Sequence, residues 1–140
     1  MPSLPSHVFL AVFDGHGGKG AAIYAEEHMI EVIENTDEWK SYLESADKTP
    51  EHCGRALTTA FLRVDTMMRT FQSTTKGRDY SGCTSVTCMI TPTHYICANA
   101  GDSRCVLGTN NTTIPMSYDH KPDDKEEYDR IINAGGTVQM

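Results

Sequence analysis

The chain has 140 residues, 39% of them hydrophobic and 22% charged, a composition that fits one globular domain and excludes a disordered, collagen-like or coiled-coil protein. Its net charge of −7 argues against nucleic acid as the main partner, because a phosphate backbone requires a basic surface. No apolar run approaches the roughly 20 residues that span a bilayer, so we expect no membrane segment.

The first half of the chain predicts a strand and two or three helices. Residues 7–13 are an apolar run that suits a buried strand, and the glycine-rich residues 14–18 end it. Apolar residues then recur at three-to-four spacing from Ala21 to Val32, which predicts a helix. Residues 38–48 predict either a short helix or a loop.

A longer helix should begin at Thr49 and Pro50, which supply a capping hydroxyl and a proline at the first helical position. Its apolar positions step by three or four residues and form one stripe, which we expect to face the core. The stripe consists of Cys53, Leu57, Ala60, Val64, Met67 and Phe71. The polar residues 73–82 predict a loop.

The second half changes to a β-type pattern. Residues 83–90 and 95–100 are β-prone and predict a hairpin, and residues 104–107 and 114–118 predict further short strands. A final helix is then indicated. We expect Asp123 to cap it with Glu126 as capping-box partner, and two glycines to end it. Its predicted buried side is Tyr128, Ile131 and Ile132, and the glycines are Gly135 and Gly136.

The cysteines indicate a reducing compartment rather than a disulfide framework. There are five, an odd number, and none forms a C-x-x-C pair. Four lie in apolar, strand-like surroundings, where free cysteine behaves as a small hydrophobic residue. With no basic-then-apolar leader at the start of the chain, this pattern favours an intracellular location, in the cytoplasm, the nucleus or both.

Residues 15–20 match the pattern GxGxxG between a strand and a helix, which is the context of a dinucleotide-binding site. That fingerprint also requires a second parallel strand that ends near an acid such as Glu34 or Asp37. No β-prone run lies between residues 35 and 49. Dinucleotide binding is therefore a remote alternative.

A metal site is the second interpretation of the same segment. Asp14 follows a buried strand, and Gly15 allows its own carbonyl oxygen to approach an ion closely. Mg²⁺ and Mn²⁺ take such oxygen ligands, and His16 titrates near neutral pH, which suits a proton donor. Asp102 follows another strand at a glycine turn and would share the same edge. A tight turn with a surface aspartate would explain Asp14 equally well.

Five motifs then occur in one order along the chain. They are VFDGHGG at residues 12–18, SGCTSV at 81–86, ANAGDSR at 98–104, DHKP at 119–122 and RIINAGGTV at 130–138. With them the chain resembles the type 2C metal-dependent serine/threonine protein phosphatases, from His7 to its last residue. It departs from the family at Cys83, where serine is usual. We expect Arg104 to pair with a carboxylate and DHKP to shape the turn into the last helix.

The resemblance implies an α+β fold, a partial β-sandwich flanked by helices in α-β-β-α layers, with residues 1–140 as one incomplete catalytic domain. It implies hydrolysis of phosphoserine and phosphothreonine proteins by water activated between two Mg²⁺ or Mn²⁺ ions. Asp14 would bridge the ions as a catalytic ligand, and Gly15 would add its carbonyl oxygen. His16 would be the general acid, and Asp102 would support a third, weaker metal position.

The family domain is longer than this chain. The resemblance implies earlier strands with a phosphate-binding arginine and an acidic ligand, and a later flap with two further aspartates, none of which has a counterpart here. We therefore expect weak metal binding and little activity from the isolated chain. Unpaired sheet edges predict self-association or marginal stability. The alternative is a pseudophosphatase or truncated form that acts as a binding module.

Overall fold

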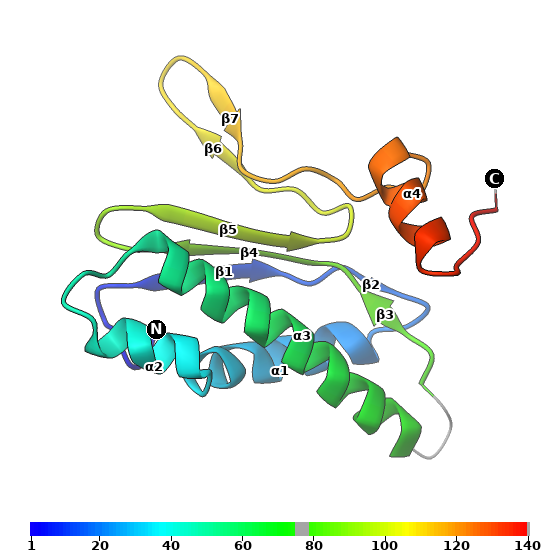
Figure 1. Ribbon diagram of the computed structural model, residues 1–140, viewed down its shortest axis with the longest axis horizontal. Helices are drawn as coiled ribbons and strands as arrows, with labels where there is room; N and C mark the ends of the chain where they lie inside the picture. The colour runs from blue at the N-terminus through cyan, green and yellow to red at the C-terminus, as the bar shows by residue number, and fades with distance from the viewer. Residues whose placement is uncertain (75–78, 140) are drawn as a thin grey trace.

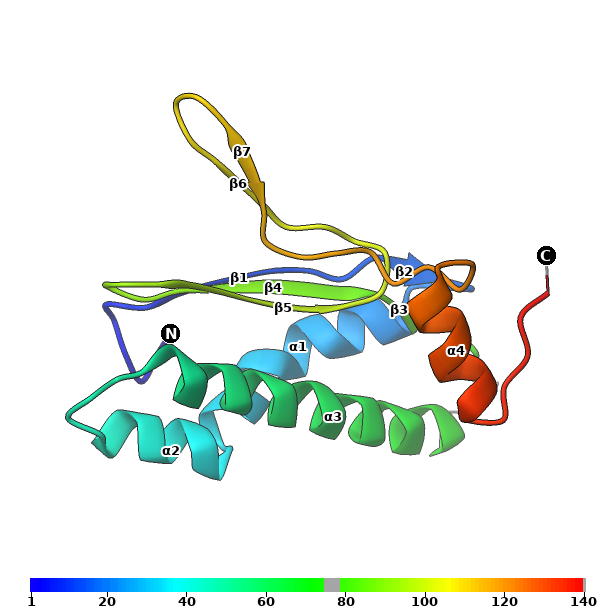
Figure 2. The same ribbon diagram turned by 45° about the horizontal axis from the view of Figure 1, so that its top comes forward.

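A three-stranded antiparallel sheet organises the fold, and three helices cover one of its faces (Figures 1 and 2). The structure, a computed structural model, describes residues 1–74 and 79–139. The sheet has the order β1-β4-β5. Its strands are β1 (Val8–Val12), β4 (Ser85–Ile90) and β5 (Tyr95–Ala100), and the helices on it are α1 (Gly20–Glu34), α2 (Asp37–Glu44) and α3 (Pro50–Thr74).

The register of the sheet separates a core face from an open face. Residues directly opposite each other in an antiparallel sheet share a face. Phe9 pairs with Met89, which pairs with Ile96, and these side chains pack in the core against the helices. Leu10 and its partner Cys88 lie on the other face. The predicted hairpin is confirmed, with β4 and β5 as its two strands.

The core lies between this sheet and the helices. Its largest fully buried side chains include Trp39, Tyr42, Ile33, Leu57 and Met89, so all three helices and the central strand contribute. Burial of such apolar surface stabilises a fold by roughly 25 cal/mol per Å². The helical layer and the sheet therefore depend on each other for their stability.

Residues 38–48, for which the sequence predicted either a short helix or a loop, contain most of α2. Thr36 caps this helix, because its Oγ1 accepts a hydrogen bond from the Trp39 backbone N–H at 3.1 Å. The same hydroxyl donates to the Ile33 carbonyl oxygen at 2.8 Å and so joins the end of α1 to the start of α2. This cap explains why a sequence with few apolar residues is helical here.

The predicted stripe of α3 is right for its first four members and wrong for its last two. Helix α3 begins at Pro50 as expected, but Met67 and Phe71 are 37% and 42% exposed. Steps alternating between four and three average 3.5 residues, whereas a straight α-helix has 3.6 residues per turn, so such a stripe drifts around the helix. Met68 packs against the core near this end instead.

Short elements complete the structure at both ends of the sheet. β2 (Gly15–His16) pairs with β3 (Gly82–Cys83), and β6 (Val106–Gly108) pairs with β7 (Thr113–Pro115). The sequence predicted no strand at residues 15–16, and it joined Cys83 to the hairpin strand. The predicted loop over residues 73–82 lies partly outside the described residues.

Helix α4 (Lys125–Asn133) differs from its prediction at its start and on its sides. Asp124, not Asp123, is the N-cap residue, and no side chain caps the helix. None of its residues is buried, so the prediction that its apolar side is buried is wrong. Figure 1 shows α4 away from the layer formed by α1 to α3. The glycine ending is confirmed, because Gly135 adopts φ +81° and Gly136 N–H donates to the Ile131 carbonyl.

The face of the sheet opposite the helices is left open. Leu10 and Val12 on β1 are 54% and 59% exposed, and Val8 and Tyr95 are exposed as well. In Figure 2 the β6–β7 hairpin rises away from this sheet. The described residues thus supply one helical layer and one main sheet of the expected α-β-β-α order. Among them no helix is long and apolar enough to cross a membrane.

Candidate metal centre

The first candidate ligand, Asp14, stands between β1 and β2 in a turn that is tied to Thr84. The Thr84 backbone N–H donates to the Asp14 carbonyl oxygen at 2.9 Å, and the Asp14 N–H donates to Thr84 Oγ1 at 3.3 Å. The next glycines, Gly17 and Gly18, adopt φ values of +67° and +141°, which favour glycine. This backbone turns the chain sharply from Asp14 into α1.

His16 follows Asp14 by two residues and lies on β2, opposite Gly82. A Cβ atom at Gly82 would clash with His16 Nε2, so the glycine provides the room that the imidazole occupies. His16 is exposed, and it also lines a cavity of about 490 Å³ together with Ser81 and Arg69. The ring is therefore open to solvent.

The second candidate ligand, Asp102, lies in a turn that packs against the same threonine. Gly101 adopts φ +114°, and a Cβ atom there would stand 2.8 Å from Thr84 Cβ and Cγ2, so this position requires glycine. The Ser103 and Thr84 hydroxyl oxygens are 2.6 Å apart and share a hydrogen bond. The structure therefore brings the Asp14 and Asp102 turns together at Thr84.

Two further residues donate hydrogen bonds to the Gly101 carbonyl oxygen. Asn99 Nδ2 donates to it at 3.1 Å and also to the Tyr118 carbonyl oxygen at 2.9 Å. The His120 backbone N–H donates to the same Gly101 oxygen at 3.0 Å. The DHKP segment is thus hydrogen-bonded to the turn that carries Asp102.

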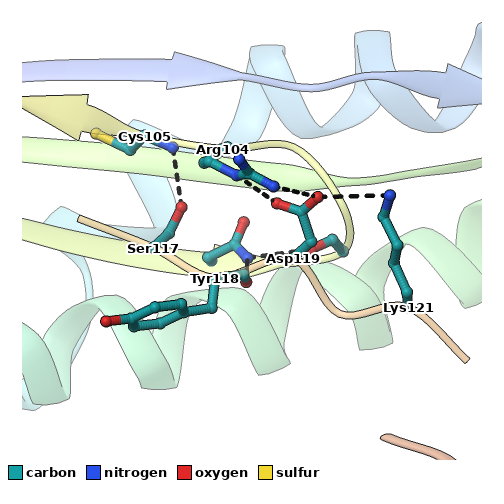
Figure 3. Close-up of polar contacts among 8 residues, drawn as sticks. Arg104, Cys105, Ser117, Tyr118, Asp119 and Lys121 are labelled. Atoms are coloured by element: carbon teal, nitrogen blue, oxygen red, sulfur yellow. Dashed lines mark hydrogen bonds and ion pairs between the residues drawn. The ribbon is translucent and has the colours of Figure 1, made fainter. Parts of the chain in front are cut away.

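Arg104 pairs with Asp119 in a bidentate ion pair, with Nε and Nη2 donating to the carboxylate at 2.8 and 2.9 Å (Figure 3). Lys121 Nζ lies 3.7 Å from the same carboxylate. The Asp119 side chain is 12% exposed, and the guanidinium holds the pKa of its carboxyl below the ordinary value. The prediction that Arg104 pairs with a carboxylate is confirmed.

The candidate ligands are of the type that a hard cation binds, but there are too few of them among the described residues. Asp14 and Asp102 are both exposed, and neither carboxylate has a hydrogen-bond or ion-pair partner among the described residues. Carboxylate and carbonyl oxygens are the ligands that Mg²⁺ and Mn²⁺ prefer. Over residues 1–74 and 79–139, however, no group of three or more His, Cys, Asp or Glu side chains is placed to hold a metal ion.

The sequence patterns did not single out Thr84 or Asn99. Both lie inside quoted motifs, but their contacts join residues 70 positions apart in one case and 19 in the other. A local pattern cannot reveal such pairs. The remote dinucleotide interpretation gains nothing from the fold, because within residues 35–49 the chain forms α2 and no second parallel strand.

Similar proteins point to a single family. Protein phosphatase 1B of Rattus norvegicus is 38% identical over 135 residues, which is 94% of this chain and 35% of that protein. Human Protein phosphatase 1A is also 38% identical, over all of this chain and 36% of its own length. The solved serine-threonine phosphatase 2C from Toxoplasma gondii has a TM-score of 0.85 at 25% identity, over 99% of this chain and 48% of that one.

This structural likeness confirms the predicted α+β fold of the phosphatase type. The chain spans about a third of the length of the curated relatives it matches. The family model Protein phosphatase 2C matches residues 2–140, and the chain therefore belongs to the protein phosphatase 2C family.

Proposed function

We propose that the chain is the central part of a metal-dependent protein serine/threonine phosphatase, which hydrolyses phosphoserine and phosphothreonine in proteins. One observation carries the proposal. The turns of Asp14 and Asp102, which come from two separate motifs of the family, both bond to Thr84 and so lie at one end of the sheet. Both residues are exposed there, and neither carboxylate has a hydrogen-bond or ion-pair partner among the described residues.

Each residue has a distinct part in this proposal. Asp14, the Gly15 carbonyl oxygen and Asp102 would hold two Mg²⁺ or Mn²⁺ ions and a third, weaker one. Bound divalent cations supply a lowered pKa for water and charge neutralisation at a phosphoryl group. His16, two residues after Asp14, is exposed and would donate a proton to the oxygen of the departing serine or threonine. The glycines next to these residues would let the backbone approach a bound ion closely.

A chimaera tests this function without relying on the isolated chain. The aligned 135 residues of rat Protein phosphatase 1B are replaced by this chain, and Mn²⁺-dependent release of phosphate from a phosphopeptide is measured. We expect a folded, active enzyme. Asp14→Asn should abolish the metal-dependent rate, and His16→Ala should lower kcat by about 10²- to 10⁴-fold, the usual worth of a general acid.

A folded chimaera without metal-dependent activity would contradict the proposal. That result would favour the pseudophosphatase alternative, in which the chain acts as a binding module, and the shortage of metal ligands among the described residues is the observation that keeps this alternative open. The 140-residue chain by itself should show little or no turnover for the same reason. An intracellular location stays a prediction, based on the cysteines, all five of which are free.

A further inference from the structure

Thr84 lies between the two candidate ligand turns and bonds to both. It separates β3 from β4 and is 9% exposed. Toward Asp14 it makes two hydrogen bonds, one through its backbone N–H and one through its side-chain Oγ1. Toward Ser103, the residue after Asp102, it makes a third bond of 2.6 Å through the same Oγ1.

The direction of the bond between the Asp14 backbone and the Thr84 side chain follows from the groups involved. The Asp14 backbone N–H can only donate, so Thr84 Oγ1 accepts that bond. Either hydroxyl can donate in the bond between Thr84 Oγ1 and Ser103 Oγ, and in both cases one oxygen atom of Thr84 connects the two turns. The Thr84 methyl group adds a packing contact, because it leaves no space for a Cβ at Gly101.

We propose that Thr84 is a positioning residue, whose hydroxyl fixes the Asp102 turn relative to the Asp14 turn. The proposal deepens the phosphatase function above and rests on its metal centre. Ligands that come from separate turns must be held to within about 0.5 Å for productive geometry, and groups behind the ligands do this holding. Among the described residues, Thr84 hydrogen-bonds to Asp14 on one side and to Ser103 on the other.

Two substitutions separate the hydroxyl from the methyl group. Thr84→Val keeps the shape and the packing against Gly101 but removes the oxygen. Thr84→Ser keeps the oxygen and removes the methyl group. Thr87→Val is the matched control, because Thr87 is a buried threonine of β4 whose Oγ1 donates to Ala98 within the sheet and reaches neither turn.

The first measurement needs no metal. Amide hydrogen exchange of the 140-residue chain is followed by NMR at Asp14, which donates to Thr84, and at His120, which donates to the Gly101 carbonyl. Thr84→Val should raise both exchange rates by about tenfold, the change expected from losing one net hydrogen bond. Thr84→Ser and Thr87→Val should leave the ratio of these rates to that of a core amide in α1 unchanged.

The second measurement is the affinity for Mn²⁺ of the chimaera with rat Protein phosphatase 1B, read from the free-ion EPR signal. Thr84→Val should weaken it by about 10- to 100-fold, the usual effect of losing a group that orients a ligand, and Thr84→Ser should restore it. Unchanged exchange at Asp14 or His120 in Thr84→Val overturns the positioning role. Exchange that rises while Mn²⁺ affinity stays the same overturns its link to the metal.

A separate outcome identifies failure of the function itself. If the folded chimaera with the unaltered chain binds no Mn²⁺, or if its Asp14→Asn variant binds Mn²⁺ equally well, then the proposed metal centre is wrong. The exchange rates of Thr84→Val still decide in that case whether Thr84 couples the two turns. The two failures are therefore distinguishable.

Discussion

His7 shows how a single residue ties the start of the chain to the helical layer. Its Nε2 lies 2.7 Å from the Tyr42 hydroxyl, and its ring stands edge-on to Trp39. The side chain is almost completely buried. Burial lowers the pKa of its imidazole, and the positive amino terminus and Lys48 act in the same direction.

A pH dependence of stability follows from this histidine. Because the folded pKa lies below the unfolded value of about 6.5, the unfolded chain binds the proton more readily. The contribution of His7 is therefore complete above pH 6.5 and is lost as the pH falls toward the folded pKa. Urea denaturation between pH 7.5 and 5.5 should show this loss of unfolding free energy.

His7→Gln is the variant that checks the assignment. It should flatten the pH dependence in this range, because glutamine does not titrate. Another histidine serves as the control: His94 is exposed in the turn between β4 and β5, and His94→Gln should keep the slope. A slope that survives in His7→Gln would show that a different group is responsible.

At the scale of elements, α3 carries the clearest difference between buried and exposed leucines. Leu57 is fully buried in the core, whereas Leu62, little more than one turn later, is 66% exposed. Leu57→Ala should lower the unfolding free energy by about 2–5 kcal/mol, because it removes buried methyl groups and leaves a cavity. Leu62→Ala should change it by no more than about 0.5 kcal/mol. Chemical denaturation of both variants measures the difference.

Equal effects of the two substitutions would mean that α3 does not pack on the sheet as described. The comparison is direct, since both changes remove the same atoms from the same helix. Helix propensity also changes by the same small amount at both sites. Only the burial of the two side chains differs.

The elements also show what the sequence could and could not predict. Period and capping located α1 and α3, and two β-prone runs located the β4–β5 hairpin, because these signals depend on residues close together in the chain. The β2–β3 pair was missed, since two-residue strands are too short to show any period. The apolar positions of α4 have helical spacing but no layer beside them to bury them, so spacing alone overestimated their burial.

The candidate site divides in the same way. The sequence motifs supplied the residues Asp14, His16 and Asp102, and the fold shows the turns of the two aspartates meeting at Thr84. That meeting depends on contacts between distant segments. A chemical pattern can nominate such residues, but only the packing of β1, β4 and β5 brings them to one end of a sheet.

At the scale of the whole molecule, the open face of the sheet governs solution behaviour. Val8, Leu10 and Val12 on β1 are all exposed, and β1 is an edge strand. Exposed apolar patches and free strand edges both favour association with another chain. We expect the isolated chain to self-associate through this face and edge.

Leu10→Glu tests this expectation by placing a charge in the middle of the patch. Sedimentation velocity over a range of concentrations should show a shift toward the monomer in this variant. Leu62→Glu places the same charge on α3 at a similarly exposed leucine and should leave the association unchanged. A chain that stays monomeric at all concentrations before any substitution would contradict the prediction.

The register of the sheet also has a consequence for the order of events during synthesis. β1 is made before its neighbour β4, with Val8 opposite Ile90, and the helices α1, α2 and α3 lie between the two strands in the sequence. The three helices between them can form from local contacts in the meantime. Until β4 emerges, the VFLAV segment lacks its partner strand in this sheet, so a nascent chain presents this apolar segment during the interval when chaperones engage unfinished proteins.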